Sequence, residues 1–319
     1  MTETFIWVRC YFCFAHWVLC YDATAAETFL TAYGKPETAA LIKIKTLQRF
    51  TFSLFCAIII PIGVFILICI TGDMHGELDR FNDKKIKSLK KGDMLIVCGD
   101  FGFVWDGSKR ENAVLKAIGR KKFYTLFVEG CHENYDLLSK FPERDFCGGK
   151  VNVISGNLMH LKRGNIFDLQ GYRFFAFGGG QTKEIDIRRD SKTWYEAELP
   201  TTEEVRDAVL TLKNADNTID YIVTHEPPAT MKEFLGFEVR QISHMHTFFD
   251  AIKNDCKFKM WFFGKAHINK IIPPKYHCLF DDVVCLKNDE WDKQQKLLKK
   301  QKKKPQPEQN NAAPIHDFE

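Results

Sequence analysis

Six acidic or imidazole side chains follow apolar runs of strand length along this 319-residue chain. They are Asp73, His75, Asp100, His132, His225 and His267. Carboxylate and imidazole groups suit Mn, Fe or Zn ions, which activate water and polarise oxygen atoms. Asp73 and His75 lie two positions apart, so an extended backbone points both side chains the same way, toward one ion. A lone histidine at a strand end is usually structural, and the prediction of a metal site therefore depends on the whole set.

The elements that would position these side chains alternate regularly. Apolar runs at residues 65–71, 94–98 and 123–128 each end in a turn rich in glycine and in candidate ligands. Helical stretches are expected at residues 77–89 and 108–118. This β-α-β order predicts a mostly parallel sheet, whose strands have their carboxyl ends at one edge.

The second half of the chain changes its pattern. Short runs between residues 151 and 180 are separated by glycine turns that predict hairpins. Thr201 and Glu204 form a capping-box pattern, which opens a helix to about residue 213. Strands are then expected at 219–224 and 260–264, with a helix near 243–254 between them and further strands to residue 286.

Read in order, the motifs are Asp-x-His at Asp73, Gly-Asp at Asp100, Gly-Cys-His-Glu at His132, a single His225, and Gly-Lys-x-His at His267. This series resembles the calcineurin-like metallophosphoesterase superfamily, whose signature runs Asp-x-His, Gly-Asp, Gly-Asn-His-Glu/Asp, His, Gly-His-x-His. The sequence around the motifs resembles a bacterial branch of uncharacterised members. The resemblance covers residues 66–286 and implies an α/β fold, a four-layer αββα sandwich with two mixed β-sheets.

The resemblance also implies a role for each motif residue. Asp73, His75 and His267 would bind a first divalent ion, Asp100 would bridge two ions, and His225 would bind the second. His132 would be the catalytic proton donor or the partner of a phosphoryl oxygen. The implied activity is hydrolysis of a phosphomonoester or phosphodiester by a metal-bound hydroxide, with Mn, Fe or Zn as the metal.

Two departures from the signature affect the second ion. Cys131 replaces the asparagine, and Lys265 replaces the first histidine of the last motif. An ammonium group has no lone pair and repels a cation, whereas a thiolate at Cys131 would be a weak substitute ligand. We therefore expect one ion, doubt the second, and expect Lys265 to place a positive charge near the substrate. A noncatalytic metal-binding regulatory or interaction domain on the same fold is the alternative.

The loop at residues 178–194 follows an apolar run and would overhang the site. Arg188 or Arg189 would grip a phosphate, and Trp194 would stack on a base. Solvated charges on a surface loop are the competing interpretation.

Composition limits the other possibilities. Apolar residues make up 45% of the chain, which is enough for a globular core. Residues 293–304 carry seven of the lysines, so the rest of the chain is net negative and no specific nucleic-acid binding is predicted. Eleven scattered cysteines indicate thiols in a reducing compartment rather than a disulfide framework, which favours a cytoplasmic protein.

Three regions are expected along the chain. Residues 1–64 form an apolar extension without motifs, 65–287 form the phosphoesterase domain, and 288–319 form a lysine-rich, disordered tail. The run at residues 50–64 is shorter than a membrane-spanning helix and contains Pro61 and Gly63. A membrane anchor there, or binding of the tail to an anionic membrane, is a less favoured alternative.

Overall fold

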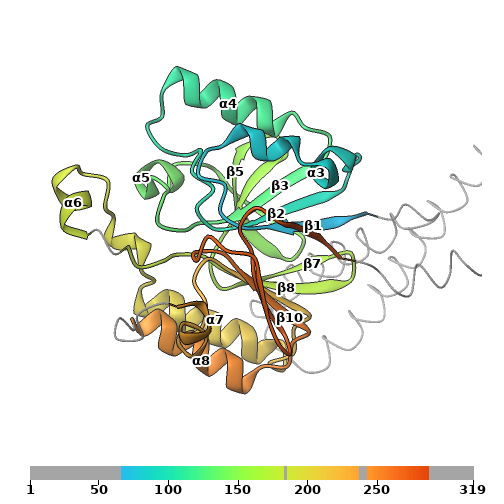
Figure 1. The fold of residues 1–319 in the computed structure, drawn as a ribbon, viewed down its shortest axis with the longest axis vertical. Coiled ribbons are helices and arrows are strands. Elements are labelled where there is room, and N and C mark those ends of the chain that lie inside the picture. The colour runs from blue at the N-terminus through green and yellow to red at the C-terminus, as the bar shows by residue number, and fades with distance from the viewer. Residues whose placement is uncertain (1–65, 183–184, 237–242, 287–319) are drawn as a thin grey trace, which may run out of the picture. The chain divides into compact units, whose positions relative to one another are not determined.

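The computed structural model describes residues 66–182, 185–236 and 243–286. These residues form two stacked β-sheets with helices on both outer faces (Figure 1). The four-layer αββα arrangement and the two mixed sheets expected from the sequence are therefore confirmed.

The first sheet has seven strands within the described residues, and its central strands are parallel. In spatial order they are β13 (Val283–Cys285), β1 (Ile68–Thr71), β2 (Met94–Cys98), β3 (Tyr124–Val128), β6 (Leu158–Leu161), β5 (Gly149–Ser155) and β4 (Glu143–Phe146). Strands β1, β2, β3 and β6 run parallel, while β13, β5 and β4 pair antiparallel with their neighbours. Strand β2 is buried along its whole length, as its uninterrupted apolar run predicts.

The second sheet has six strands in the described part of the chain. Their order is β11 (Lys270–Ile272), β12 (Tyr276–Cys278), β10 (Met260–Phe263), β9 (Tyr221–Thr224), β8 (Tyr172–Phe177) and β7 (Asn165–Leu169). Strands β8, β9, β10 and β12 are parallel, and the two edge strands are antiparallel to their neighbours.

Helices cover the outer faces of both sheets. The first sheet carries α3 (Lys84–Ser88), α4 (Lys109–Gly119) and α5 (Tyr135–Leu138), and the second carries α7 (Thr202–Asn214) and α8 (His244–Asp255). The remaining described helices are α6 (Ile185–Asp190) and the 3-10 turns η1 (Leu78–Asn82), η2 (Glu196–Glu198), η3 (Ala229–Met231) and η4 (Glu233–Leu235). Apolar side chains alternate along the strands, so one cluster fills the space between the sheets and one lies under each helical layer.

Local sequence signals explain where most elements begin. Ser108 caps α4, and Thr201 with Glu204 forms the expected capping box of α7. The single helix expected at residues 77–89 is wrong, because Asp83 accepts hydrogen bonds from the next turn and starts α3 after η1. The hairpin expected at Gly164 is also wrong, since the chain crosses there from the first sheet to the second.

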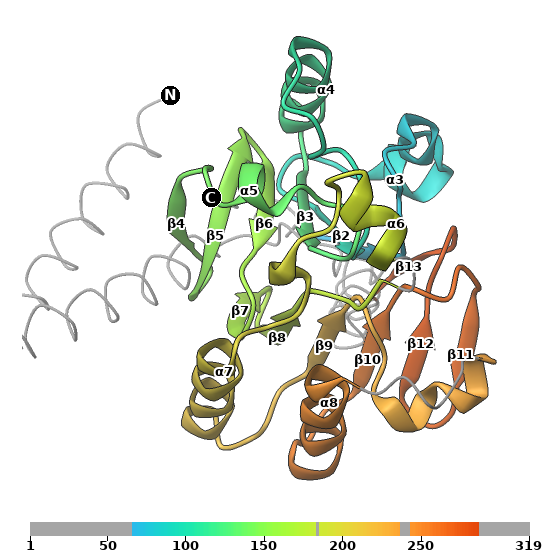
Figure 2. The ribbon, with the colours of Figure 1, turned by 90° about the vertical axis from the view of Figure 1, so that its left-hand side faces the viewer.

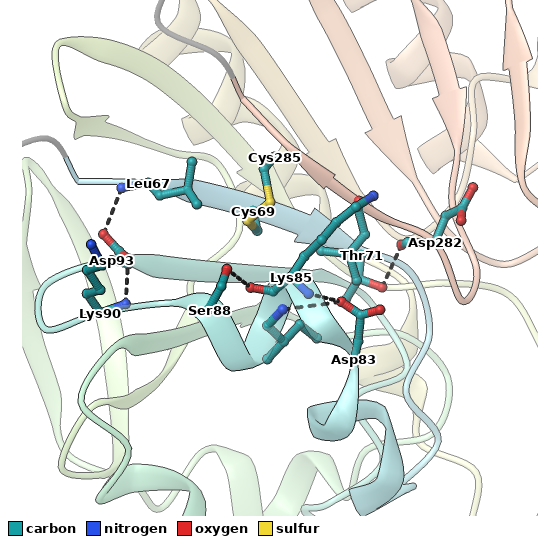
Figure 3. Close-up of a disulfide and its surroundings, with 12 residues drawn as sticks. Leu67, Cys69, Thr71, Asp83, Lys85, Ser88, Lys90, Asp93, Asp282 and Cys285 are labelled. Atoms are coloured by element: carbon teal, nitrogen blue, oxygen red, sulfur yellow. Dashed lines mark hydrogen bonds between the residues drawn. A yellow bond between two sulfur atoms is a disulfide. The ribbon is translucent and has the colours of Figure 1, made fainter.

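A disulfide joins the two ends of the described chain. Cys69 of β1 lies directly opposite Cys285 of β13, and their sulfur atoms are bonded (Figure 3). Nearby, the Thr71 hydroxyl donates to the Asp282 carbonyl at 2.9 Å. The expectation that the cysteines are thiols is wrong for this pair, whereas Cys98, Cys131, Cys256 and Cys278 are free thiols. The cytoplasmic location stays a prediction, which the disulfide does not favour.

None of the helices in the described part of the chain has both the length and the apolar character needed to cross a membrane. The expected apolar extension, its possible anchor at residues 50–64 and the lysine-rich tail all lie outside the described residues.

Candidate metal centre

The candidate ligands meet because five parallel strands end at the same edge of the two sheets. Strands β2 and β3 of the first sheet and β9 and β10 of the second lead into this region (Figure 2), as does β1 beside β2 (Figure 1). The turns are tied together by their backbones, since the amides of Met74 and His75 donate to the Asp100 carbonyl at 3.0 and 2.9 Å. The Gly76 amide donates to the Phe101 carbonyl at 3.0 Å.

The first group of candidate ligands contains Asp73, His75, Asp100 and His267. One ligand atom from each lies within 4.8 Å of the others, although the residues are up to 194 positions apart. The Nε2 atoms of His75 and His267 face each other at 2.9 Å, and His267 Nε2 lies 3.1 Å from Asp73 Oδ2. The structure thus brings together the residues that the sequence predicted for the first ion.

This first group fits a divalent cation. Two carboxylates and two imidazoles are ligands that Mn, Fe and Zn accept, and ligands about 2.0–2.2 Å from one ion lie only a few ångströms apart. Both aspartates are buried. Four residues of the site adopt left-handed backbone conformations: His75, Asp100, Lys265 and His267. Such strained conformations persist where the surrounding structure fixes them, and they cluster at functional sites.

The second group contains Asp100, Cys131 and His225. His225 Nε2 lies 3.5 Å from Asp100 Oδ1 and has no hydrogen-bond partner, although the side chain is fully buried. The amides of Cys131 and His132 donate to Asp100 Oδ1 at 2.5 and 2.9 Å. Burial alone would lower the pKa of His225, but the carboxylates of Asp100 and Asp73 raise it well above its ordinary value.

Lys265 makes this second group unsuitable for another metal ion. Its Nζ donates to Cys131 Sγ at 3.0 Å and to the Gln181 carbonyl at 3.3 Å. Burial raises the pKa of the Cys131 thiol, although the Lys265 ammonium opposes this shift. Because the ammonium lies among the ligand atoms and offers no lone pair, the residues present do not fit a second cation.

Glu226 and His246 belong to the site but were not identified from the sequence. Glu226 is 3% exposed, and its Oε1 lies 3.5 Å from Lys265 Nζ. Its Oε2 lies 2.9 Å from His246 Nε2, and the Ser243 hydroxyl lies 2.8 Å from His246 Nδ1. Glu226 directly follows His225 in the sequence, which was the available signal, whereas nothing in the helix sequence marks His246.

His132 and His267 are the two half-exposed histidines of the site. His132 Nε2 lies 3.8 Å from Asp100 Oδ2, and 47% of the His132 side chain is exposed. Burial of part of the ring lowers the pKa of His132. The adjacent Glu133 is buried and accepts hydrogen bonds from the amides of Gly102 and Gly130, at 3.1 and 2.7 Å. Glu133 thereby joins the turn that carries Asp100 to the turn that carries His132.

The arginines of the loop have partners within the protein. Arg188 is buried and donates to the carbonyls of Cys131 and Thr193, at 2.6 and 2.5 Å, and its Nη1 lies 3.2 Å from Glu198 Oε1. Arg189 lies over the Trp194 ring at 4.4 Å. The contact that we expected between Arg188 and a phosphate is therefore not favoured, because its guanidinium supports the Cys131 turn instead.

A buried charge network lies behind these turns. Glu129 meets His160 Nε2 at 2.6 Å and accepts a hydrogen bond from Arg163 Nε. Arg163 also donates to the Ala197 carbonyl at 2.7 Å, and the Glu129 carbonyl accepts from the Gly179 amide at 2.7 Å. The network connects the end of β3 to the loop after β8.

Comparison with known proteins supports the family resemblance. A comparison with curated proteins found no match. The model of the calcineurin-like phosphoesterase family matches residues 66–269, which is more than half of the chain and includes every motif described above. The chain therefore belongs to the calcineurin-like phosphoesterase family.

Proposed function

We propose that this protein binds a divalent metal ion through Asp73, His75, Asp100 and His267 and hydrolyses a phosphoester. The observation that carries the proposal is the convergence of these four side chains from three strand ends, with their ligand atoms within 4.8 Å of one another. A divalent cation bound there supplies Lewis acidity, which lowers the pKa of water and polarises a phosphoryl oxygen. Mn, Fe and Zn all match this set of ligands.

The chain's own residues supply orientation and proton transfer. Arg80 donates to the Asp73 carbonyl at 2.6 Å, which fixes the turn that presents Asp73. The Lys265 backbone amide donates to both Asp73 carboxylate oxygens at 3.1 Å. These hydrogen bonds orient the carboxylate. His132 lies at the exposed rim of the group, where it would give a proton to the departing oxygen or contact a phosphoryl oxygen.

Hydrolysis of p-nitrophenyl phosphate and of its bis ester, with Mn, Fe or Zn added, tests this proposal. Asp100→Asn should reduce turnover by about 100-fold or more, because it removes a charged ligand rather than an outer partner. Asp168→Asn on the exposed surface of β7 is the matched control and should keep wild-type turnover. Metal-dependent turnover that survives Asp100→Asn would refute the proposal.

One observation favours a second function, a noncatalytic metal-binding domain. Lys265 Nζ lies 3.0 Å from Cys131 Sγ, within the region where the resemblance implies another ion. A protein that binds Mn stoichiometrically but hydrolyses neither ester with any metal would support this alternative.

A further inference from the structure

A buried ammonium group lies in the second group of candidate ligands, and its surroundings are built to hold it. Lys265 comes from the turn after β10, in a left-handed conformation with φ of +68°. Its backbone amide is fixed on the Asp73 carboxylate, while its side chain reaches across to Cys131. The side chain is only 16% exposed, so the ammonium is not a mobile surface charge.

The ammonium of Lys265 faces three acceptor atoms of the protein. Cys131 Sγ lies at 3.0 Å, the Gln181 carbonyl at 3.3 Å and Glu226 Oε1 at 3.5 Å. An ammonium has three N–H groups. Two of them donate to Cys131 Sγ and to the Gln181 carbonyl, and Glu226 forms an ion pair with the same nitrogen. Gly180 makes this packing possible, because a side chain there would meet Cys131 Sγ and Glu226.

Glu226 supplies the countercharge. Its carboxylate is held on one side by the Gln181 amide at 2.9 Å and on the other by His246 Nε2 at 2.9 Å. His246 is fully buried on α8 and is fixed in turn by Ser243. A buried carboxylate in this position needs a nearby positive charge, and the Lys265 ammonium faces it at 3.5 Å.

We infer that the ammonium of Lys265 occupies the place of a second metal ion. Glu226 and the Gln181 carbonyl hold the ammonium there. This inference rests on the proposed function and adds that the centre is mononuclear. Asp100 and His225, which would otherwise share the second ion, face a fixed single positive charge instead. Glu226 and His246 act as positioning residues for Lys265.

Manganese binding to the full-length protein tests the inference. After equilibrium dialysis against Mn²⁺, the wild type should hold one ion per chain and give a mononuclear six-line spin-resonance spectrum. Cys131→Asn with Lys265→His, which restores two ligand side chains, should hold two ions with an exchange-coupled spectrum. Lys116→His on the exposed face of α4 is the control and should match the wild type.

The outcomes separate the two proposals. Two manganese ions per wild-type chain would overturn the inference and leave the proposed function intact. A folded double variant that still holds one ion would also overturn it, because Lys265 would not be what excludes the second ion. No bound manganese in the wild type would overturn the proposed function, and this inference with it.

Lysine reactivity provides a test that does not depend on the double variant folding. In the wild type, an amine-labelling reagent followed by mass spectrometry should modify Lys265 at least tenfold more slowly than Lys116. Glu226→Gln should raise the labelling rate of Lys265, whereas Glu233→Gln on the exposed turn η4 should not. Equal labelling of Lys265 and Lys116 in the wild type would overturn the inference.

Discussion

Replacing Glu129 with glutamine should destabilise the protein in a way that depends on pH. Glu129 is 2% exposed and faces the buried guanidinium of Arg163 and the ring of His160. Removing one partner of a buried ion pair leaves the other charge uncompensated, which costs about 3–5 kcal/mol of unfolding free energy. Glu204, the other acidic partner of Arg163, is 43% exposed and does not replace that interaction.

The pH dependence follows from the pKa of Glu129. Burial alone would raise this pKa, but the charges of Arg163 and His160 outweigh burial and lower it from 4.5 to about 2. A carboxylate whose pKa is lowered by folding stabilises the protein above its unfolded pKa, and this stabilisation is lost as the pH falls through the folded pKa. The shift corresponds to about 3 kcal/mol. The difference in unfolding free energy between wild type and Glu129→Gln should therefore be largest above pH 5 and should decrease as the pH falls toward 2.

Urea unfolding of both proteins across this pH range measures the difference in unfolding free energy, from which the titration of groups that do not contact Glu129 cancels. Glu204→Gln is the control, because glutamine keeps the capping box of α7 and the exposed ion pair contributes at most about 1 kcal/mol. A difference that does not change with pH, or a cost for Glu129→Gln no larger than for Glu204→Gln, would refute the reasoning.

Three further predictions concern the disulfide and the metal site. Cys285→Ser removes a disulfide that joins residues 216 positions apart, and it should lower the unfolding free energy measured in urea by about 2–5 kcal/mol. Equal stability of the variant and the wild type would contradict this prediction. Gly264→Ala should weaken Mn²⁺ binding at least tenfold by calorimetry, because the added Cβ would overlap the Asp73 carboxylate; unchanged affinity would show that the site tolerates the methyl group. His132→Ala should lower kcat by about 100-fold or more while the manganese content stays the same; a parallel loss of metal would indicate that His132 is a ligand instead.

The parallel central strands and the first group of candidate ligands could be anticipated from the sequence. Apolar runs followed by glycine turns fix where a strand ends, and parallel neighbours bring those ends to one edge. Asp73, Asp100 and His267 therefore come together for reasons that can be read along the chain. The departure at Lys265 was also visible, although its contacts with Gln181 and Glu226 were not.

The remaining features depend on contacts between distant residues that resemble ordinary surface residues in the sequence. Arg188 lies in a charged stretch that is typical of a surface loop. It is buried because its guanidinium donates to the Cys131 carbonyl and pairs with Glu198. The pairing of Cys69 with Cys285 depends on the register of β1 with β13, which no local pattern specifies. The crossing at Gly164 looks like a hairpin turn locally, but β6 and β7 on its two sides belong to different sheets.

Anomalous diffraction from crystals soaked in Mn²⁺ tests the central claim most directly. We predict one manganese peak, bounded by Asp73, His75, Asp100 and His267, with no second peak beside Lys265. A peak elsewhere in the protein, or no peak at these four side chains, would contradict the account.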